Sequence, residues 1–192
     1  MSSRHSLNSR LITSNIKISV KVRIPRSSLE SFKTLRGFTK ETYSFFVHRR
    51  RRLVYTFYYS GHVNVTGIKK KFDLQKILKF LYSIDGFEKV TQIHVDNVTV
   101  TGCVSPLHLT SNFRQQLYSI AKLGLFDSIA YKRQSFPGAF LKKKQVGTIV
   151  FFSSGKFNIV GCRSRLQVRD LIDRFSRALI FSRDAEKEGA GR

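Results

Sequence analysis

The side chains that most often carry catalysis or bind metals are few and scattered in this 192-residue chain. The five histidines lack ligand spacing such as H-E-x-x-H, and the acidic residues form no metal-binding motif. Neither a phosphate-binding Walker loop nor a G-x-S-x-G turn occurs, and Cys103 and Cys162 have no evident base. The sequence therefore indicates a protein that is not an enzyme, with no cofactor and no metal.

Lysine and arginine have a clearer chemical use. They number 35 against 12 acidic residues, which gives a net charge of +23 and a pI near 10.6. Such a surface attracts polyanions by neutralising phosphates and releasing counterions. Nucleic acid is the expected partner, an anionic membrane surface is the runner-up, and a merely soluble basic protein is the plain alternative. We expect an intracellular protein, because we find neither a secretory signal nor a stretch approaching about 18–20 apolar residues.

Two basic runs are placed where phosphates would pass. Each lies between two predicted strands, at corresponding positions in the two halves of the chain, although solvated turns would also carry such runs. The runs are Arg49, Arg50, Arg51 and Arg52 in the first half and Lys142, Lys143 and Lys144 in the second.

An internal repeat organises the chain. The segment TFYYSGHVNVTGIKK, from Thr56, aligns without a gap with VFFSSGKFNIVGCRS, which begins 94 residues later at Val150. Each copy is typical of a strand, a Ser-Gly turn, a second strand and a terminating glycine. Apolar residues then recur at i, i+3, i+4 and i+7 from Leu74 and from Val168, which predicts an amphipathic helix in each half. Matching patterns at one offset indicate a duplication.

Strands complete each half upstream of these hairpins. Alternating apolar and polar residues predict strands over 15–22 and 97–101, and shorter strands are expected over 43–47 and 139–142.

A further helix is expected in each half. Ser27 and Glu30 form a capping box for the first, and Ser111 or Thr110 caps the second, which carries Phe113. Each half is then strand, helix, three strands, helix.

These elements predict the domain plan. Residues 15–88 form the first repeat and residues 89–182 the second, between flexible tails over 1–14 and 183–192. The simplest assembly is an α+β fold, in which one curved ten-stranded antiparallel sheet carries four helices on one face.

The second half contains Phe136-Pro137-Gly138, a basic strand, FFSSGK, a glycine-ended strand and a long helix. With the asparagine-initiated strands and the two-repeat plan, this order resembles the TATA-binding protein (TBP) family over roughly residues 12–181. The resemblance implies a TBP-like saddle of two pseudo-symmetric repeats, whose concave sheet binds and bends double-stranded DNA in the minor groove. It also implies a role in transcription initiation in the nucleus, or a viral host nucleus, with general transcription factors or polymerase subunits on the convex helices.

The resemblance assigns side chains to the groove. Asn15 and Asn97 match the central base readers, Phe136 and Phe152 match one pair of wedges, and Lys156 matches a phosphate-contacting lysine. The whole set expected to contact DNA bases is Asn15, Lys17, Tyr58, Asn64, Thr66, Asn97, Thr99, Phe136, Phe152, Asn158 and Val160.

The first repeat departs from the family at its wedges. Tyr58 stands where the second repeat has a phenylalanine, and its hydroxyl needs a partner or solvent. The partner wedge is expected near Thr42 or Tyr43, where no phenylalanine stands, and Phe45 and Phe46 are close but out of step. That half is expected to kink DNA less.

Asn64 and Asn158 stand where the family usually has valine. An asparagine oxygen accepts a hydrogen bond from the guanine amino group, which an apolar groove floor excludes. The expected DNA site is therefore A·T-rich or relaxed rather than a strict TATA box. Two alternatives stay open: the same fold as an architectural, RNA- or single-strand-binding module without a promoter role, and a basic protein that coats nucleic acid in a particle.

Overall fold

The chain forms two compact units, the N-terminal unit (residues 14–97) and the C-terminal unit, which holds residues from 98 onward together with the first few described residues. Strand β6 (Val90–Cys103) contributes to both. The computed structural model describes residues 12–22, 38–42, 44–70, 72–84 and 90–190.

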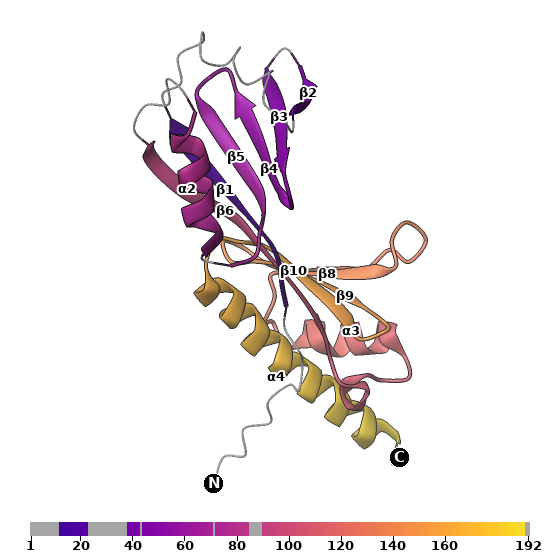
Figure 1. Ribbon diagram of the computed structural model, residues 1–192. Helices are drawn as coiled ribbons and strands as arrows, with labels where there is room; N and C mark the ends of the chain where they lie inside the picture. The colour runs from indigo at the N-terminus through magenta and orange to yellow at the C-terminus, as the bar shows by residue number, and fades with distance from the viewer. Residues whose placement is uncertain (1–11, 23–37, 43, 71, 85–89, 191–192) are drawn as a thin grey trace. The chain divides into compact units, whose positions relative to one another are not determined.

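The N-terminal unit is an antiparallel sheet with helix α2 (Phe72–Tyr82) against one face (Figure 1). The hydrogen-bonded order is β2-β3-β4-β5-β1-β6. In β4, alternate residues Leu53, Tyr55 and Phe57 are buried in one core with Ile77 of α2. The strands are β1 (Ile12–Val22), β2 (Phe38–Glu41), β3 (Phe45–Arg50), β4 (Leu53–Tyr58), β5 (His62–Ile68) and the first part of β6.

The C-terminal unit is a second antiparallel arrangement, with the order β6-β10-β9-β8-β7. Figure 1 shows α3 and α4 together on one face of these strands. Phe151 and Phe157 from the strands pack on Phe175 of α4, with ring centroids 4.9 and 5.3 Å apart. The elements are the rest of β6, the 3-10 helix η2 (Pro106–His108), α3 (Phe113–Lys122), β7 (Ser128–Ala130), β8 (Gly138–Lys143), β9 (Gly147–Phe152), β10 (Lys156–Cys162) and α4 (Arg165–Ala190).

The α+β part of the predicted fold class is confirmed, because an antiparallel sheet is combined with helices. Both predicted hairpins are present as β4–β5 and β9–β10. Gly61 and Gly155 of the two Ser-Gly turns have φ of 83° and 81°, a left-handed conformation that glycine adopts without strain. The helix predicted from Ser27 lies outside the described residues, as does Tyr43.

The predicted cap of α3 was wrong. The side chain of Asn112, rather than Ser111 or Thr110, accepts the N–H of Gln115 at 3.1 Å. Ser111 is used differently, because its hydroxyl and N–H donate to the carboxylate of Glu186 at 2.9 and 3.2 Å.

The predicted C-terminal tail was also wrong, since α4 continues to Ala190. Tertiary contacts explain the extension. Ser182 is 2% exposed and accepts a hydrogen bond from the Gln116 amide of α3 at 3.3 Å, and Glu186 binds Ser111 one turn further on. The end of α4 is therefore docked on α3.

Asp73 ties the start of α2 to the β3–β4 turn. Its carboxylate accepts the N–H groups of Lys69 and Lys70, both at 3.0 Å, and pairs with the guanidinium of Arg52. Burial alone would raise the pKa of Asp73, but these donors outweigh it and lower the pKa to about 2. The native state is thus stabilised by the ionised carboxylate.

We predict that Asp73→Asn lowers the free energy of unfolding by about 2 kcal/mol at neutral pH, as its pKa shift implies. Because the folded pKa lies below the unfolded one, this contribution is complete above pH 4 and is lost as the pH falls toward 2. Urea unfolding at pH 7 and pH 2 measures it. Asp173→Asn, an exposed control on α4, should change stability by less than about 0.5 kcal/mol. An Asp73→Asn penalty that persists at pH 2 would contradict the assignment.

Candidate nucleic-acid interface

In both units the residues that alternate with the core lie on the sheet face away from the helices, which we name the open face. In β10, Phe157 and Ile159 are buried, while Asn158 and Val160 between and after them are only half-buried. The same alternation holds along β4 and β5, because successive side chains of a strand point to opposite faces. In β9, Val150 is buried as well as its neighbours Ile149 and Phe151, and Phe152 is half-buried.

Three phenylalanines cluster on the open face of the C-terminal unit. The ring centroid of Phe136 lies 5.2 Å from that of Phe140 and 5.9 Å from that of Phe152. Phe136 is 39% exposed and Phe140 is 41% exposed, which is unusual for such large apolar side chains. The cluster contains both predicted wedges and adds Phe140, which the sequence reasoning missed although it follows Gly138 by two residues on the same strand face.

Gly138 makes room for this cluster. It pairs with Phe152 across β8 and β9. A Cβ atom on Gly138 would lie 2.7 Å from Cε1 of Phe136 and 2.9 Å from Cε1 of Phe152, closer than real Cβ contacts allow. The absence of a side chain here therefore lets the two rings approach each other.

Polar side chains continue the open face beside the phenylalanines. Phe152, Lys156 and Asn158, all predicted DNA contacts, line one hollow of about 510 Å³. Thr101, the cross-strand partner of Asn158, lines it too and was not predicted. The structure thus brings these residues together.

Other predicted contacts lie along the same face. Asn97 and Thr99 alternate along β6 with the buried Val98 and Val100, and Val160 pairs with Thr148 of β9. Thr99 and Val160 belong to the C-terminal unit, and Asn97 belongs to the N-terminal unit.

The open face of the N-terminal unit has different chemistry. Asn64 donates from Nδ2 to the Tyr58 hydroxyl at 3.3 Å, which supplies the partner that this tyrosine requires. Phe45 pairs with Tyr58 across β3 and β4, with ring centroids 5.6 Å apart. Phe45 is therefore in step with Tyr58, contrary to expectation, while Phe46 is 1% exposed in the core. Thr66 lies on this face beyond Asn64.

A difference in turn length explains the position of Phe45. Two residues connect Arg50 to Leu53, whereas three connect Lys143 to Gly147. The register therefore shifts by one residue relative to the second repeat, and Phe45 occupies the position that Gly138 holds there.

Asn15 and Lys17 both have partners within the N-terminal unit. Asn15 Oδ1 accepts the N–H of Gly67 at 2.7 Å, and Gly67 has φ of 87° with no space for a Cβ atom beside the Arg52 carbonyl. Lys17 Nζ lies 3.7 Å from the carboxylate of Asp96. Asn15 is therefore a structural residue whatever else it contacts.

The structure divides the first basic run between the two faces. Arg49 alternates with the buried His48 and lies on the open face. Arg50 lies over the ring of Phe80 in α2, 5.0 Å from its centroid, and Arg52 pairs with Asp73. Arg51 is in the turn with φ of 54°. Two of the four guanidinium groups thus lie on the helix side.

The second run is divided similarly. Lys142 lies on the open face next to the buried Leu141. Lys143 Nζ lies 3.0 Å from Asp127, and the Lys144 N–H donates to the same carboxylate at 2.6 Å. The Lys144 N–H and the Lys143 ammonium lower the pKa of Asp127, so its carboxylate remains paired.

The described residues also bear on metal and thiol chemistry. Within them, no group of three His, Cys, Asp or Glu residues is placed to hold a metal ion. Burial raises the pKa of Cys162 to about 11, which keeps this thiol protonated at neutral pH. Across the same residues, no helix has the length and apolar character needed to cross a membrane.

Known proteins resemble this arrangement. Residues 92–180 match the family model described as transcription factor TFIID, or TATA-binding protein. The solved structure of Methanococcus jannaschii TBP is similar with a TM-score of 0.68 at 20% identity, over 88% of this chain and 98% of that one. A rolling circle replication initiator from Geobacillus stearothermophilus gives only 0.39 at 9% identity, over 88% and 80%. No curated protein sequence matches.

We predict that Gly138→Ala keeps the fold but pushes the rings of Phe136 and Phe152 apart, at a cost of about 1 kcal/mol from overpacking. Nuclear Overhauser effects between the two rings measure the separation, and urea unfolding measures the cost. Ser154→Ala, in the neighbouring exposed turn, should change neither. Unchanged ring-to-ring effects in Gly138→Ala would contradict the role given to this glycine.

Proposed function

We propose that this chain, whose residues 92–180 match the TATA-binding protein family model, is a divergent TBP-like protein that binds double-stranded DNA in the minor groove, bends it and acts in transcription initiation. The proposal includes the full saddle: one curved ten-stranded sheet whose concave side is made of the two open faces, with four helices on the convex side.

The cluster of Phe136, Phe140 and Phe152 is the observation that carries the proposal. Exposed rings grouped on an uncovered sheet face suit insertion between base pairs, where they replace stacking that the kink removes. Phe136 and Phe152 act as the wedge pair, and Phe140 extends their apolar surface.

Cations beside the cluster supply the non-specific part of binding. Lys156 shares a hollow with Phe152, and Lys142 and Arg49 lie on the open faces, so these three are proposed to contact phosphates. Arg50, Arg52 and Lys143 are held by other protein groups and are expected to contribute less.

The asparagines are proposed to read the groove floor. The Asn15 oxygen is occupied by Gly67, which leaves its amide hydrogens for the acceptors that every base pair presents in the minor groove. Asn64 is turned the other way: its amide nitrogen binds Tyr58, so its oxygen is available to a guanine amino group. Asn97 and Asn158 complete the set.

We place this activity in the nucleus, with general transcription factors or polymerase subunits bound on the helix side of the units. The family likeness supports both statements, and the basic residues on α2 favour acidic partners.

We predict that the chain selects an A·T-rich or relaxed site from a short randomised duplex library at physiological salt, and bends it. Phe136→Ala and Phe152→Ala should each weaken binding by about 1–3 kcal/mol, the usual worth of an aromatic ring stacked on a base, and reduce the bend. Gel shift and fluorescence energy transfer between labelled duplex ends measure affinity and bending.

Phe181→Ala is the matched control, because Phe181 is 44% exposed on α4 away from the open face. Binding that is equal for all sequences and unaffected at Phe136 and Phe152 would overturn the minor-groove proposal. A strong preference for single strands or RNA would support the architectural alternative instead.

We further predict that Asn64→Val and Asn158→Val sharpen rejection of G·C pairs by about 1–3 kcal/mol at the contacted position, the usual cost of a mismatched pair. Valine cannot accept a hydrogen bond from the guanine amino group and leaves it unpaired. Competition binding against single G·C substitutions measures the effect. Thr56→Val, which makes the face next to Asn64 more apolar without removing an amide, is the control. Equal G·C tolerance in all variants would be the contrary result.

A further inference from the structure

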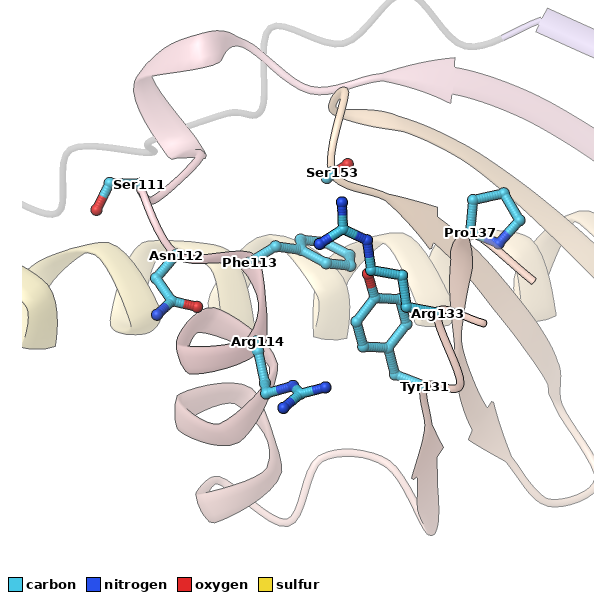
Figure 2. A pocket seen from close by; sticks show the side chains of 8 residues that line it. All are labelled: Ser111, Asn112, Phe113, Arg114, Tyr131, Arg133, Pro137 and Ser153. Atoms are coloured by element: carbon cyan, nitrogen blue, oxygen red, sulfur yellow. The ribbon is translucent and has the colours of Figure 1, made fainter. Parts of the chain in front are cut away.

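A large hollow lies on the C-terminal unit beside the proposed wedges Phe136 and Phe152. It measures about 740 Å³ and is lined by Phe113 and Arg114 at the start of α3, by Tyr131 and Arg133 after β7, and by Pro137 and Ser153. Figure 2 shows the guanidinium group of Arg133 beside the rings of Phe113 and Tyr131, while Arg114 extends from α3 below them. The hollow thus combines an aromatic wall with two cations.

The charge of this hollow is one-sided. No carboxylate lines it, and neither guanidinium forms an ion pair or hydrogen bond with any residue that the structure describes. The nearby Glu186 carboxylate is engaged by Ser111. Arg114 also lies in the first turn of α3, where the helix dipole disfavours a cation and no acidic side chain compensates it. An anionic ligand would relieve this unfavourable placement.

The aromatic wall is held in place by the core. The Phe113 ring packs at 84° against Tyr131, with centroids 5.2 Å apart, and contacts the buried Phe151 on the helix side of the sheet. This side is opposite to the one that carries Phe152. Pro137 and Ser153, which directly follow the proposed wedges Phe136 and Phe152 in the chain, also line the hollow, so duplex DNA is included in the test as a competitor.

We propose that this hollow binds an acidic segment of a partner protein, with an aromatic or aliphatic side chain against Phe113 and Tyr131. The flanking carboxylates of the segment would bind Arg114 and Arg133 through charge-assisted hydrogen bonds. A hollow of this volume accommodates several side chains, and its mixed lining fits a peptide better than a single inorganic anion.

The test is selection from a display library of random peptides on the full chain, followed by fluorescence anisotropy with the enriched peptides. We expect enriched peptides to be acidic and to contain aromatic residues. The double variant Arg114→Glu/Arg133→Glu should weaken their binding by at least about tenfold for each guanidinium lost, the range of a strong charge-assisted contact. Tyr131→Ala should weaken binding without any change of charge.

Arg163→Glu/Arg169→Glu is the matched control, since it makes the same charge change at two exposed sites on the same unit. Peptide binding retained in this control, together with unchanged affinity of the hollow variants for duplex DNA, supports the site. Equal loss in both double variants, enrichment of peptides without acidic residues, or competition by duplex DNA would overturn it. The DNA measurement also separates this proposal from the proposed function, because either can fail alone.

Discussion

One-sided burial of the antiparallel strands is the constraint on which the rest of the molecule depends. Phe57 and Val65 in one unit, and Phe151 and Ile159 in the other, must face the core, and alternation then sends their neighbours to the open face. A slip of one residue would exchange the two sets, burying amides such as Asn158 and exposing the core rings, so the register is firmly specified. The candidate interface is therefore a consequence of core packing, because the same alternation that fills the core also fixes which side chains a ligand meets.

The β3–β4 turn is one residue shorter than the β8–β9 turn, and this difference gives the open faces of the two units different side chains. Where the C-terminal unit has Gly138 and space for three rings, the N-terminal unit has Phe45 packed on Tyr58, whose hydroxyl is bound to Asn64. The first arrangement leaves two of its rings, those of Phe136 and Phe140, exposed. The second is already packed and hydrogen-bonded, and rearranging it would break contacts. The two units thus share the same strand arrangement, but the shorter β3–β4 turn changes which side chains lie on the open face of the N-terminal unit.

The sequence was sufficient for whatever followed from periodicity and from the repeat: the hairpins, the helix stripes of α2 and α4, and the alternation that puts Phe152 and Asn158 on one face. It was insufficient where distant contacts decided. Phe45 pairs with Tyr58 because the β3–β4 turn is short, which the repeat alignment does not show. Phe140 lies beside Phe136 because of the register of β8 against β9. The end of α4 was misjudged because Glu186 looks like a tail residue until Ser111 is present to bind it.

The net charge, too, predicts only part of the candidate site. A net charge of +23 indicates a polyanionic partner, but it does not indicate a face. The strand alternation that sorts the phenylalanines also sorts the cations, so adjacent residues such as Arg49 and Arg50 serve opposite sides of one sheet. Arg50 and Arg52 hold the β3–β4 turn against α2. Arg114 and Arg133 line the aromatic hollow of the C-terminal unit. A basic protein of this size therefore has cations for more than one task.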